Sequence, residues 1–150
     1  MTALLEVSDL GVGFAQGSHI TQAVKGVSFS VNKGETVALV GESGSGKSVT
    51  ALSTVSLLGS SAKVTGSVRY DGREMIGASE RDLRRVRGND ISFIFQEPMT
   101  SLNPLHTIEK QLGESLALHQ GVSGDQARGR IVELLNKVGI RDPENRLGSY

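Results

Sequence analysis

Residues 37–53 read VALVGESGSGKSVTALS and place a turn rich in glycine and serine between two apolar runs. The glycines of this turn lack a Cβ atom, so the backbone can adopt conformations that other residues resist and can lie close to a ligand. Residues 36–40 have the pattern of a buried strand, and residues 48–58 have the pattern of a helix. A glycine-rich turn between a strand and a helix is typical of phosphate-binding sites.

The turn also matches a specific motif. Residues 41–48 fit the pattern G-x-x-x-x-G-K-[ST], in which the amide groups of the loop point inward around an anion. We expect Lys47 to reach the β- and γ-phosphates and the Ser48 hydroxyl to bind Mg²⁺. A flexible turn is the alternative, but the flanking strand and helix favour a nucleoside triphosphate site.

The composition excludes several classes of protein. The chain has 150 residues, 37% of them hydrophobic, which suits one domain or part of one. Basic and acidic residues both number 16, so no strong field recruits nucleic acid or an anionic membrane. The absence of cysteine excludes disulfides and cysteine-ligated metals. Without a leader-like N-terminus or an apolar run of bilayer length, we expect a soluble, cytoplasmic chain.

Short alternating patterns bounded by glycine predict strands at residues 4–10, 24–31 and 66–72. The sequence NKGE at residues 32–35 predicts the turn that leads to the strand before the loop. The dense run ISFIF at residues 91–95 predicts another buried strand. These β-rich pieces are expected to surround the strand that carries the phosphate-binding loop.

Three further helices are predicted after the one at residues 48–58. A capping box from Ser79 to Asp82 opens a short helix, and a second box from Ser123 to Gln126 opens a longer one. Apolar residues at helical spacing define the face of the longer helix and that of a helix before it: Leu105, Ile108, Leu112, Leu116; Ala127, Ile131, Leu134, Leu135, Val138. With no partner at ligand spacing, His106 and His119 are not expected to bind a metal.

The short helix contains four arginines, which could be interpreted as a patch for phosphate or RNA. Acidic residues flank them, so a solvated helix face is the favoured interpretation. The residues concerned are Arg81, Arg84, Arg85 and Arg87.

Gln96 directly follows the predicted strand at residues 91–95. In open α/β sheets ligands gather at the carboxyl ends of strands, so Gln96 could contact Mg²⁺ or the attacking water. A glutamine that merely begins a loop fits this spacing equally well.

The sequences GESGSGKS at residues 41–48 and FQEPMTSLNPL at residues 95–105 resemble the nucleotide-binding subunit of ATP-binding cassette (ABC) transporters. Within that family they resemble the dipeptide, oligopeptide and nickel import group, over essentially the whole chain. Residues 86–99 and 105–112 further resemble importers of microcin C or peptides in which two ATPase domains are fused, with this chain as the first.

The resemblance implies an α/β fold, a P-loop NTPase of ABC type with an incomplete core sheet. Residues 1–97 would form its β-rich nucleotide-binding part, with the Walker A loop and the Q-loop, and residues 98–150 would start a helical subdomain. The implied activity is transport-coupled ATP hydrolysis that energises import of peptides or related solutes, with ATP and Mg²⁺ as cofactors.

The resemblance also assigns the site residue by residue. Lys47 and Gln96 would be catalytic, Ser48 and Gln96 would hold Mg²⁺, and Phe14 would stack on adenine. Packing is the alternative role of Phe14, because an aromatic that ends a glycine-flanked strand often packs. The implied cofactor-binding residues are Phe14, Gly41, Glu42, Ser43, Gly44, Ser45, Gly46, Lys47, Ser48 and Val49.

The implied partners are transmembrane permease subunits, a second ATP-binding domain and, indirectly, a solute-binding protein, but no nucleic acid. The protein would then be peripheral, at the cytoplasmic face of the inner membrane. The loop residues Pro98, Met99, Leu102 and Pro104 would contact the permease, with the helices behind them as part of the docking surface. The alternative is that these four residues pack onto their own domain.

Three family motifs do not occur in these residues: the LSGGQ-type signature, a Walker B strand ending in Asp-Glu, and the switch histidine. We therefore expect the N-terminal part of an ABC ATPase domain, which binds MgATP but does not hydrolyse it alone. The alternatives are a regulatory nucleotide-binding module without turnover and a soluble ABC ATPase of DNA repair or the ribosome. The neutral charge and the peptide-type Q-loop argue against the latter.

Overall fold

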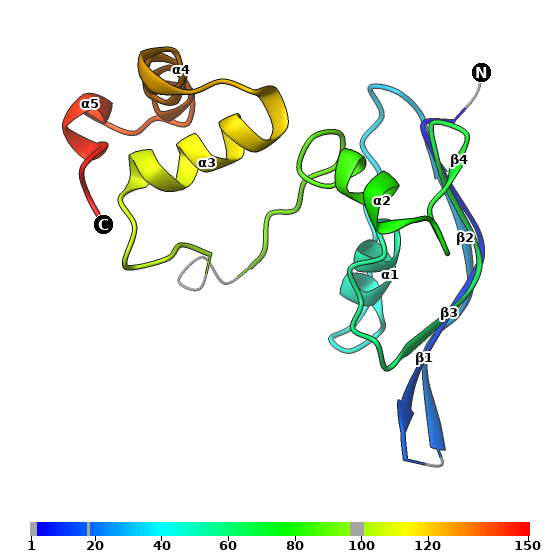
Figure 1. Ribbon diagram of the computed structural model, residues 1–150. Coiled ribbons are helices and arrows are strands. Elements are labelled where there is room, and N and C mark those ends of the chain that lie inside the picture. The colour runs from blue at the N-terminus through cyan, green and yellow to red at the C-terminus, as the bar shows by residue number, and fades with distance from the viewer. Residues whose placement is uncertain (1–2, 18, 97–100) are drawn as a thin grey trace. The chain divides into compact units, whose positions relative to one another are not determined.

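The computed structural model describes residues 3–17, 19–96 and 101–150. The chain divides into two compact units, Met1–Arg87 and Gly88–Tyr150. The first unit contains a β-sheet and two short helices, and the second contains three helices (Figure 1).

The sheet of the first unit has four antiparallel strands in the order β2-β1-β3-β4. The strands are β1 (Leu5–Gln16), β2 (His19–Val31), β3 (Ala62–Tyr70) and β4 (Arg73–Glu74). The strands predicted at residues 4–10, 24–31 and 66–72 fall on β1, β2 and β3. The pairing extends each of them at one end, but residues 71–72 form a turn after β3. The turn at 32–35 is also confirmed, since the Glu35 amide donates to the Asn32 carbonyl at 3.1 Å.

Helices α1 (Lys47–Ser53) and α2 (Glu80–Val86) lie on the same side of this sheet, and α1 contacts β1 and β2 (Figure 1). The predicted capping box is confirmed at α2, where the Ser79 hydroxyl accepts from the Asp82 amide at 3.2 Å. The buried apolar side chains of the unit come from the strands, from α2 and from the connections: Val7, Leu10, Val12, Val24, Val55, Val68, Met75, Leu83 and Val86.

The strands predicted at residues 36–40 and 91–95 are wrong as buried strands. Among the described residues neither segment pairs with a strand of the sheet. Ile91 forms a single isolated bridge, and the other residues of both segments form none. Val40 is 86% exposed and Ile94 is 101% exposed. A parallel strand is held by hydrogen bonds from neighbours distant in sequence, and the described residues supply none to these two segments.

The second unit is built from α3 (Ile108–Gln120), α4 (Gly124–Lys137) and α5 (Pro143–Arg146). Its core is small and contains Leu116, Ala127, Ile131 and Leu147, with four partly buried apolar side chains around them. α3 begins after Thr107, whose hydroxyl accepts from the Lys110 amide at 3.3 Å.

Three details of the helix predictions differ from the structure. The Ser123 side chain makes no capping hydrogen bond, because the chain enters α4 through Gly124 with φ of +61°. Leu105 lies before α3 and Val138 lies at the end of α4, so both are exposed rather than on the buried faces. The positions between them, such as Leu116 and Ile131, are buried as the spacing predicts.

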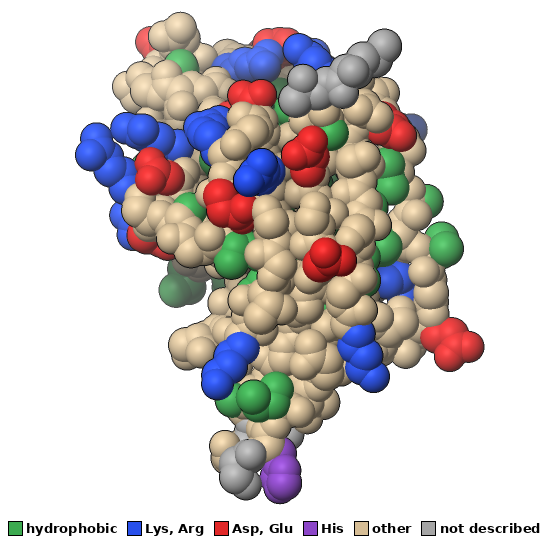
Figure 2. All heavy atoms as spheres, turned by 90° about the vertical axis from the view of Figure 1, so that its right-hand side faces the viewer, with side chains coloured by type: hydrophobic (Ala, Val, Ile, Leu, Met, Phe, Trp, Pro, Cys, Tyr) green, Lys and Arg blue, Asp and Glu red, His purple; other side chains and the backbone are tan. Residues whose placement is uncertain are grey.

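Basic and acidic side chains alternate over the face shown in Figure 2, so neither sign dominates it. This distribution agrees with the equal numbers of basic and acidic residues. Within the part of the chain that the structure describes, no helix has the length and apolar character needed to cross a membrane.

The carboxylate of Glu74 ties β4 to β3 and makes part of the stability dependent on pH. Burial raises its pKa, but hydrogen bonds from the Ser67 hydroxyl and from the amides of Val68, Ile76 and Met75 outweigh burial and hold the pKa below the usual 4.5. Because the folded pKa lies below the unfolded value, this stabilisation is present above pH 4.5 and is lost as the pH falls through the folded pKa.

We therefore expect Glu74→Gln to remove part of the acid sensitivity of the first unit. The carboxylate is 41% exposed, so solvent screening limits the effect to about 1 kcal/mol or less. The difference between the denaturant midpoints measured above and below pH 4.5 should be smaller in the variant than in the parent. Glu114→Gln, at an exposed position of the second unit, should keep the parent's pH dependence. An unchanged dependence in Glu74→Gln would contradict the assignment.

Candidate functional site at a glycine-rich loop

The loop of residues 41–46 leads directly into α1 and is shaped by its glycines. Gly44 has φ of +79° and Gly46 has φ of +92°, the left-handed region that favours glycine. A Cβ atom on Gly46 would also lie 2.6 Å from the carbonyl oxygen of Ala23 and 3.2 Å from a methyl group of Val24. The loop therefore lies against β2, and only glycine fits at position 46.

Lys47 holds the loop together at the start of α1. Its ammonium donates to the carbonyl oxygens of Gly41 at 2.8 Å and Glu42 at 2.6 Å, and a longer contact of 3.4 Å reaches the Ser45 hydroxyl. Among the described residues no carboxylate forms an ion pair with it. Its charge is thus held inside the loop by neutral oxygens.

The chemistry of these groups fits a phosphate ligand with Mg²⁺. The ammonium of Lys47 is a point charge suited to phosphate, and the exposed hydroxyl of Ser48 is the oxygen ligand that Mg²⁺ accepts. The first amides of a helix have no intrahelical acceptor, so those of Lys47, Ser48 and Val49 can donate to an anion. Glu42 and Ser43 are exposed in the loop.

Phe14 and Gln96 stay predictions. Phe14 lies in β1 opposite Thr21 of β2 and Ala62 of β3, and its side chain is half-buried in the same unit as the loop. Gln96 belongs to the second unit, where it is exposed after the extended segment at residues 91–95. Glu97, Pro98 and Met99 lie outside the described residues.

Sequence reasoning missed Arg87. Arg81, Arg84 and Arg85 are exposed, as expected for a solvated face, but the Arg87 side chain is only 21% exposed and donates to backbone carbonyls. A signal was available, because Arg87 follows the buried Leu83 by four positions and so falls on the buried side of the helix.

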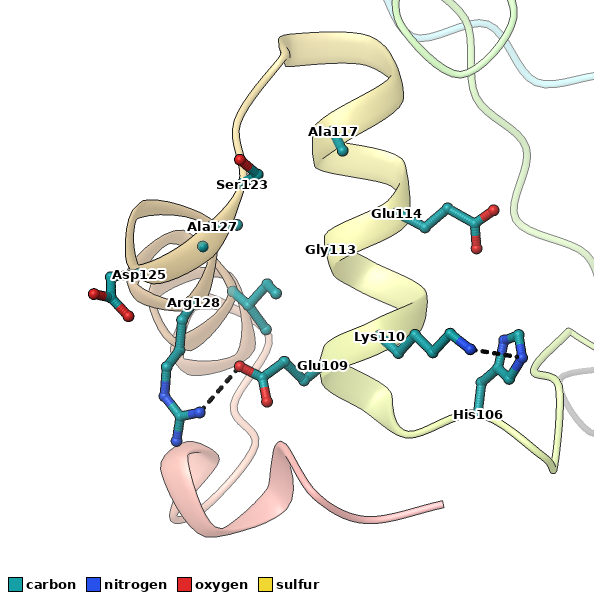
Figure 3. Close-up of a pocket in the computed structure, with 12 residues that line it drawn as sticks. His106, Glu109, Lys110, Gly113, Glu114, Ala117, Ser123, Asp125, Ala127 and Arg128 are labelled. Carbon is teal, nitrogen blue, oxygen red and sulfur yellow. Dashed lines mark hydrogen bonds and ion pairs between the residues drawn. The ribbon is translucent and has the colours of Figure 1, made fainter.

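A hollow of about 750 Å³ lies between α3 and α4 of the second unit (Figure 3). Arg128 of α4 reaches Glu109 of α3 at 3.0 Å, and the Lys110 ammonium lies 3.2 Å from the ring nitrogen Nε2 of His106. Only the first of these contacts pairs opposite charges, and the lining of the hollow also contains the carboxylates of Glu114 and Asp125, which disfavour a phosphate. The glycine-rich loop, whose Lys47 has no carboxylate partner among the described residues, is therefore the better candidate for nucleotide chemistry.

The ABC transporter family profile matches residues 24–150. The peptidoglycan transport ATP-binding protein YejF of Agrobacterium fabrum is 58% identical over 149 residues, which cover 98% of this chain and 27% of that protein. The oligopeptide transport ATP-binding protein OppD of Bacillus subtilis is 43% identical, with 100% of this chain and 42% of that protein covered. The chain thus spans about a quarter to a half of the length of the curated relatives it matches.

A solved structure, the dimeric bacterial ABC transporter cassette MJ0796, matches with a TM-score of 0.81 and 26% identity over 97% of this chain and 60% of that chain. A dimeric post-hydrolysis state of the same cassette, bound to ADP and Pi, gives the same values. The predicted P-loop fold of ABC type with an incomplete core sheet is confirmed. With the family profile matched over residues 24–150, the chain belongs to the ABC transporter family.

Proposed function

We propose that this chain carries the ATP-binding loop of an ABC transporter that energises import of peptides or related solutes. The observation that carries the proposal is the loop itself, in which Lys47 is held by neutral oxygens beside the Ser48 hydroxyl. Relatives named for oligopeptide and peptidoglycan transport support the solute class.

Each residue of the proposed site has a defined task. The amides from Gly41 to Val49 would bind the phosphates, Lys47 would neutralise charge on the β- and γ-phosphates, and Ser48 would hold Mg²⁺. Gln96 would contact Mg²⁺ or the attacking water, and Phe14 would pack on the adenine. When bound, MgATP supplies the phosphoryl group whose transfer to water drives transport.

Turnover requires more than these residues. No described carboxylate lies in the loop other than Glu42, and the 150 residues contain no Asp-Glu pair at the end of an apolar strand. We propose that binding occurs on this chain, with residues 1–97 as its nucleotide-binding part and residues 98–150 as the start of a helical subdomain. Hydrolysis then depends on carboxylates and on a second ATP-binding domain outside these residues.

A calorimetric titration of the complete gene product with MgATP tests the proposal. We expect saturable binding that weakens when Mg²⁺ is removed with EDTA, because Ser48 would then lose the metal through which it would contact the phosphates. The absence of any saturable binding would reject it. Titration with a peptide in place of MgATP is the matched control and should give no binding, since the solute site belongs to partner proteins.

The proposed partners are permease subunits at the cytoplasmic face of the membrane, contacted by the loop before α3. Leu102 and Leu105 are 52% and 81% exposed, although both are apolar. Exposed apolar side chains that lie close together are typical of interaction surfaces. Pro98 and Met99 belong to the same proposed contact but lie outside the described residues.

We expect Leu102→Asp to leave MgATP binding intact while transport is uncoupled from ATP hydrolysis. Burying a carboxylate at an apolar contact costs several kcal/mol, roughly enough to weaken docking a hundredfold. The measurement is transport and ATPase activity in reconstituted vesicles. Ile20→Asp, at a similarly exposed apolar position of the first unit, should keep both activities coupled. Normal transport by Leu102→Asp would remove the docking assignment.

A further inference from the structure

The end of α1 is held by a side chain that the nucleotide site does not include. Arg87 directly follows α2, and its guanidinium makes hydrogen bonds in two directions. Nε donates to the Val55 carbonyl at 2.8 Å and Nη2 donates to the Ser56 carbonyl at 2.6 Å. Nη1 donates to both carboxylate oxygens of Glu80, at 3.1 and 3.3 Å.

The two carbonyls belong to the segment that follows α1. Val55 is fully buried, and Ser56 has φ of +53°, a conformation that a serine rarely adopts without external constraint. The Ser56 hydroxyl also donates to the Met75 carbonyl at 3.1 Å, so this segment is fixed from two sides. A planar guanidinium matches two adjacent carbonyls and a carboxylate at once, and an ammonium cannot reproduce that geometry.

The other end of α1 is the nucleotide loop. α1 has seven residues, from Lys47 to Ser53, so its first residue and the segment that Arg87 holds are separated by two helical turns. A helix this short is not stable alone and depends on contacts with the rest of the unit, which here are the packing of α1 on β1 and β2 and the bonds to the segment after it. The position of Lys47 and Ser48 therefore depends in part on how firmly the segment at Val55 and Ser56 is fixed.

We infer that Arg87 is a positioning residue for nucleotide binding, which pre-organises the loop by fixing the far end of α1. This inference rests on the proposed function for its effect on MgATP affinity. The claim that Arg87 fixes the end of α1 does not depend on nucleotide binding and rests on the hydrogen bonds alone.

The test uses Arg87→Lys and Arg87→Met in the complete gene product, with two measurements. Hydrogen exchange of the α1 amides, without nucleotide, should be faster in both variants. The Kd for MgATP should rise about fivefold, equivalent to ~1 kcal/mol, because binding must then restore the order that Arg87 supplied. Arg87→Lys should not rescue either measurement, since the fork geometry rather than the charge is needed.

A matched control separates positioning from general destabilisation. Val7→Ala removes two methyl groups from the buried side of the same unit without touching the partners of Arg87. It should lower the thermal stability while the MgATP Kd and the exchange of α1 amides stay unchanged. Equal changes in Val7→Ala and the Arg87 variants would overturn the inference, as would Arg87 variants with the parent's Kd and exchange.

Failure of the inference can be told apart from failure of the proposed function. If the parent protein does not bind MgATP, the proposed function fails, and the exchange of α1 amides still decides whether Arg87 fixes the helix. If both Arg87 variants fail to fold, Glu80→Ala replaces them, because it removes the carboxylate that orients the guanidinium but leaves Arg87 in place. Unchanged exchange in Glu80→Ala would then overturn the inference.

Discussion

Replacing Gly66 by alanine should destabilise the sheet of the first unit by about 2–5 kcal/mol. Gly66 lies in β3 with φ of +93°, where an L side chain is strained. A Cβ atom there would lie 2.5 Å from the Asp9 carbonyl oxygen and 2.6 Å from that of Ser8. Both contacts are with backbone, so no side-chain rotation relieves them.

The reason lies in the pairing of β1 with β3. The register runs from Ser8 opposite Ser67 to Gly11 opposite Thr65, so two residues of β1 lie across from Gly66 and β1 carries one extra residue there. Asp9 takes φ of +48° within this irregularity. The two strands approach closely there, and the backbone of β1 occupies the space that a side chain at position 66 would need.

Denaturant unfolding of the complete gene product, followed by circular dichroism, measures the effect. Gly72→Ala is the matched control, because Gly72 has φ of +75° but no atom within 4 Å of the added Cβ. It should cost only the backbone strain, about 1–2 kcal/mol. Equal losses in the two variants would show that the close approach of β1 does not contribute.

Local patterns predicted the parts of this chain that depend on neighbouring residues. The Ser79 cap, the turn at residues 32–35 and the buried faces with Leu116 and Ile131 all follow from spacing along a few turns or strands. The glycine-rich turn before α1 belongs to the same group, since its glycines and Lys47 lie within eight residues and Gly44 and Gly46 take positive φ. That this turn binds phosphate stays a prediction.

The other features of the fold depend on contacts between segments distant in sequence, and a local sequence pattern does not specify such contacts. The apolar runs at residues 36–40 and 91–95 indicate what a strand would bury, but not whether a neighbouring strand is present to pair with it. The irregularity opposite Gly66 and the contacts of Arg87 at Val55 join residues more than 30 positions apart. For the same reason the roles of Phe14 and Gln96 could only be proposed.

Replacing Lys47 by alanine should weaken MgATP binding about tenfold or more, because a charged hydrogen bond to phosphate contributes roughly 1.5–3 kcal/mol. Without nucleotide the Lys47 ammonium already bonds to the carbonyls of Gly41 and Glu42. Alanine therefore removes two things, the charge that faces the phosphates and the link that holds both ends of the loop together.

The same contacts also limit the effect. To reach phosphate oxygens the ammonium exchanges part of its bonding to these carbonyls, so the net gain is smaller than that of a free ammonium. A loss of many orders of magnitude is thus not expected, since in the proposed site the backbone amides of the loop would still bind the phosphates. Calorimetric titration of the complete gene product with MgATP measures the difference, and circular dichroism checks that the variant is folded.

Lys33→Ala makes the same charge change at an exposed turn of the same unit and should keep the parent's affinity. If Lys47→Ala and Lys33→Ala bind MgATP equally well, the loop of residues 41–48 is not the nucleotide site.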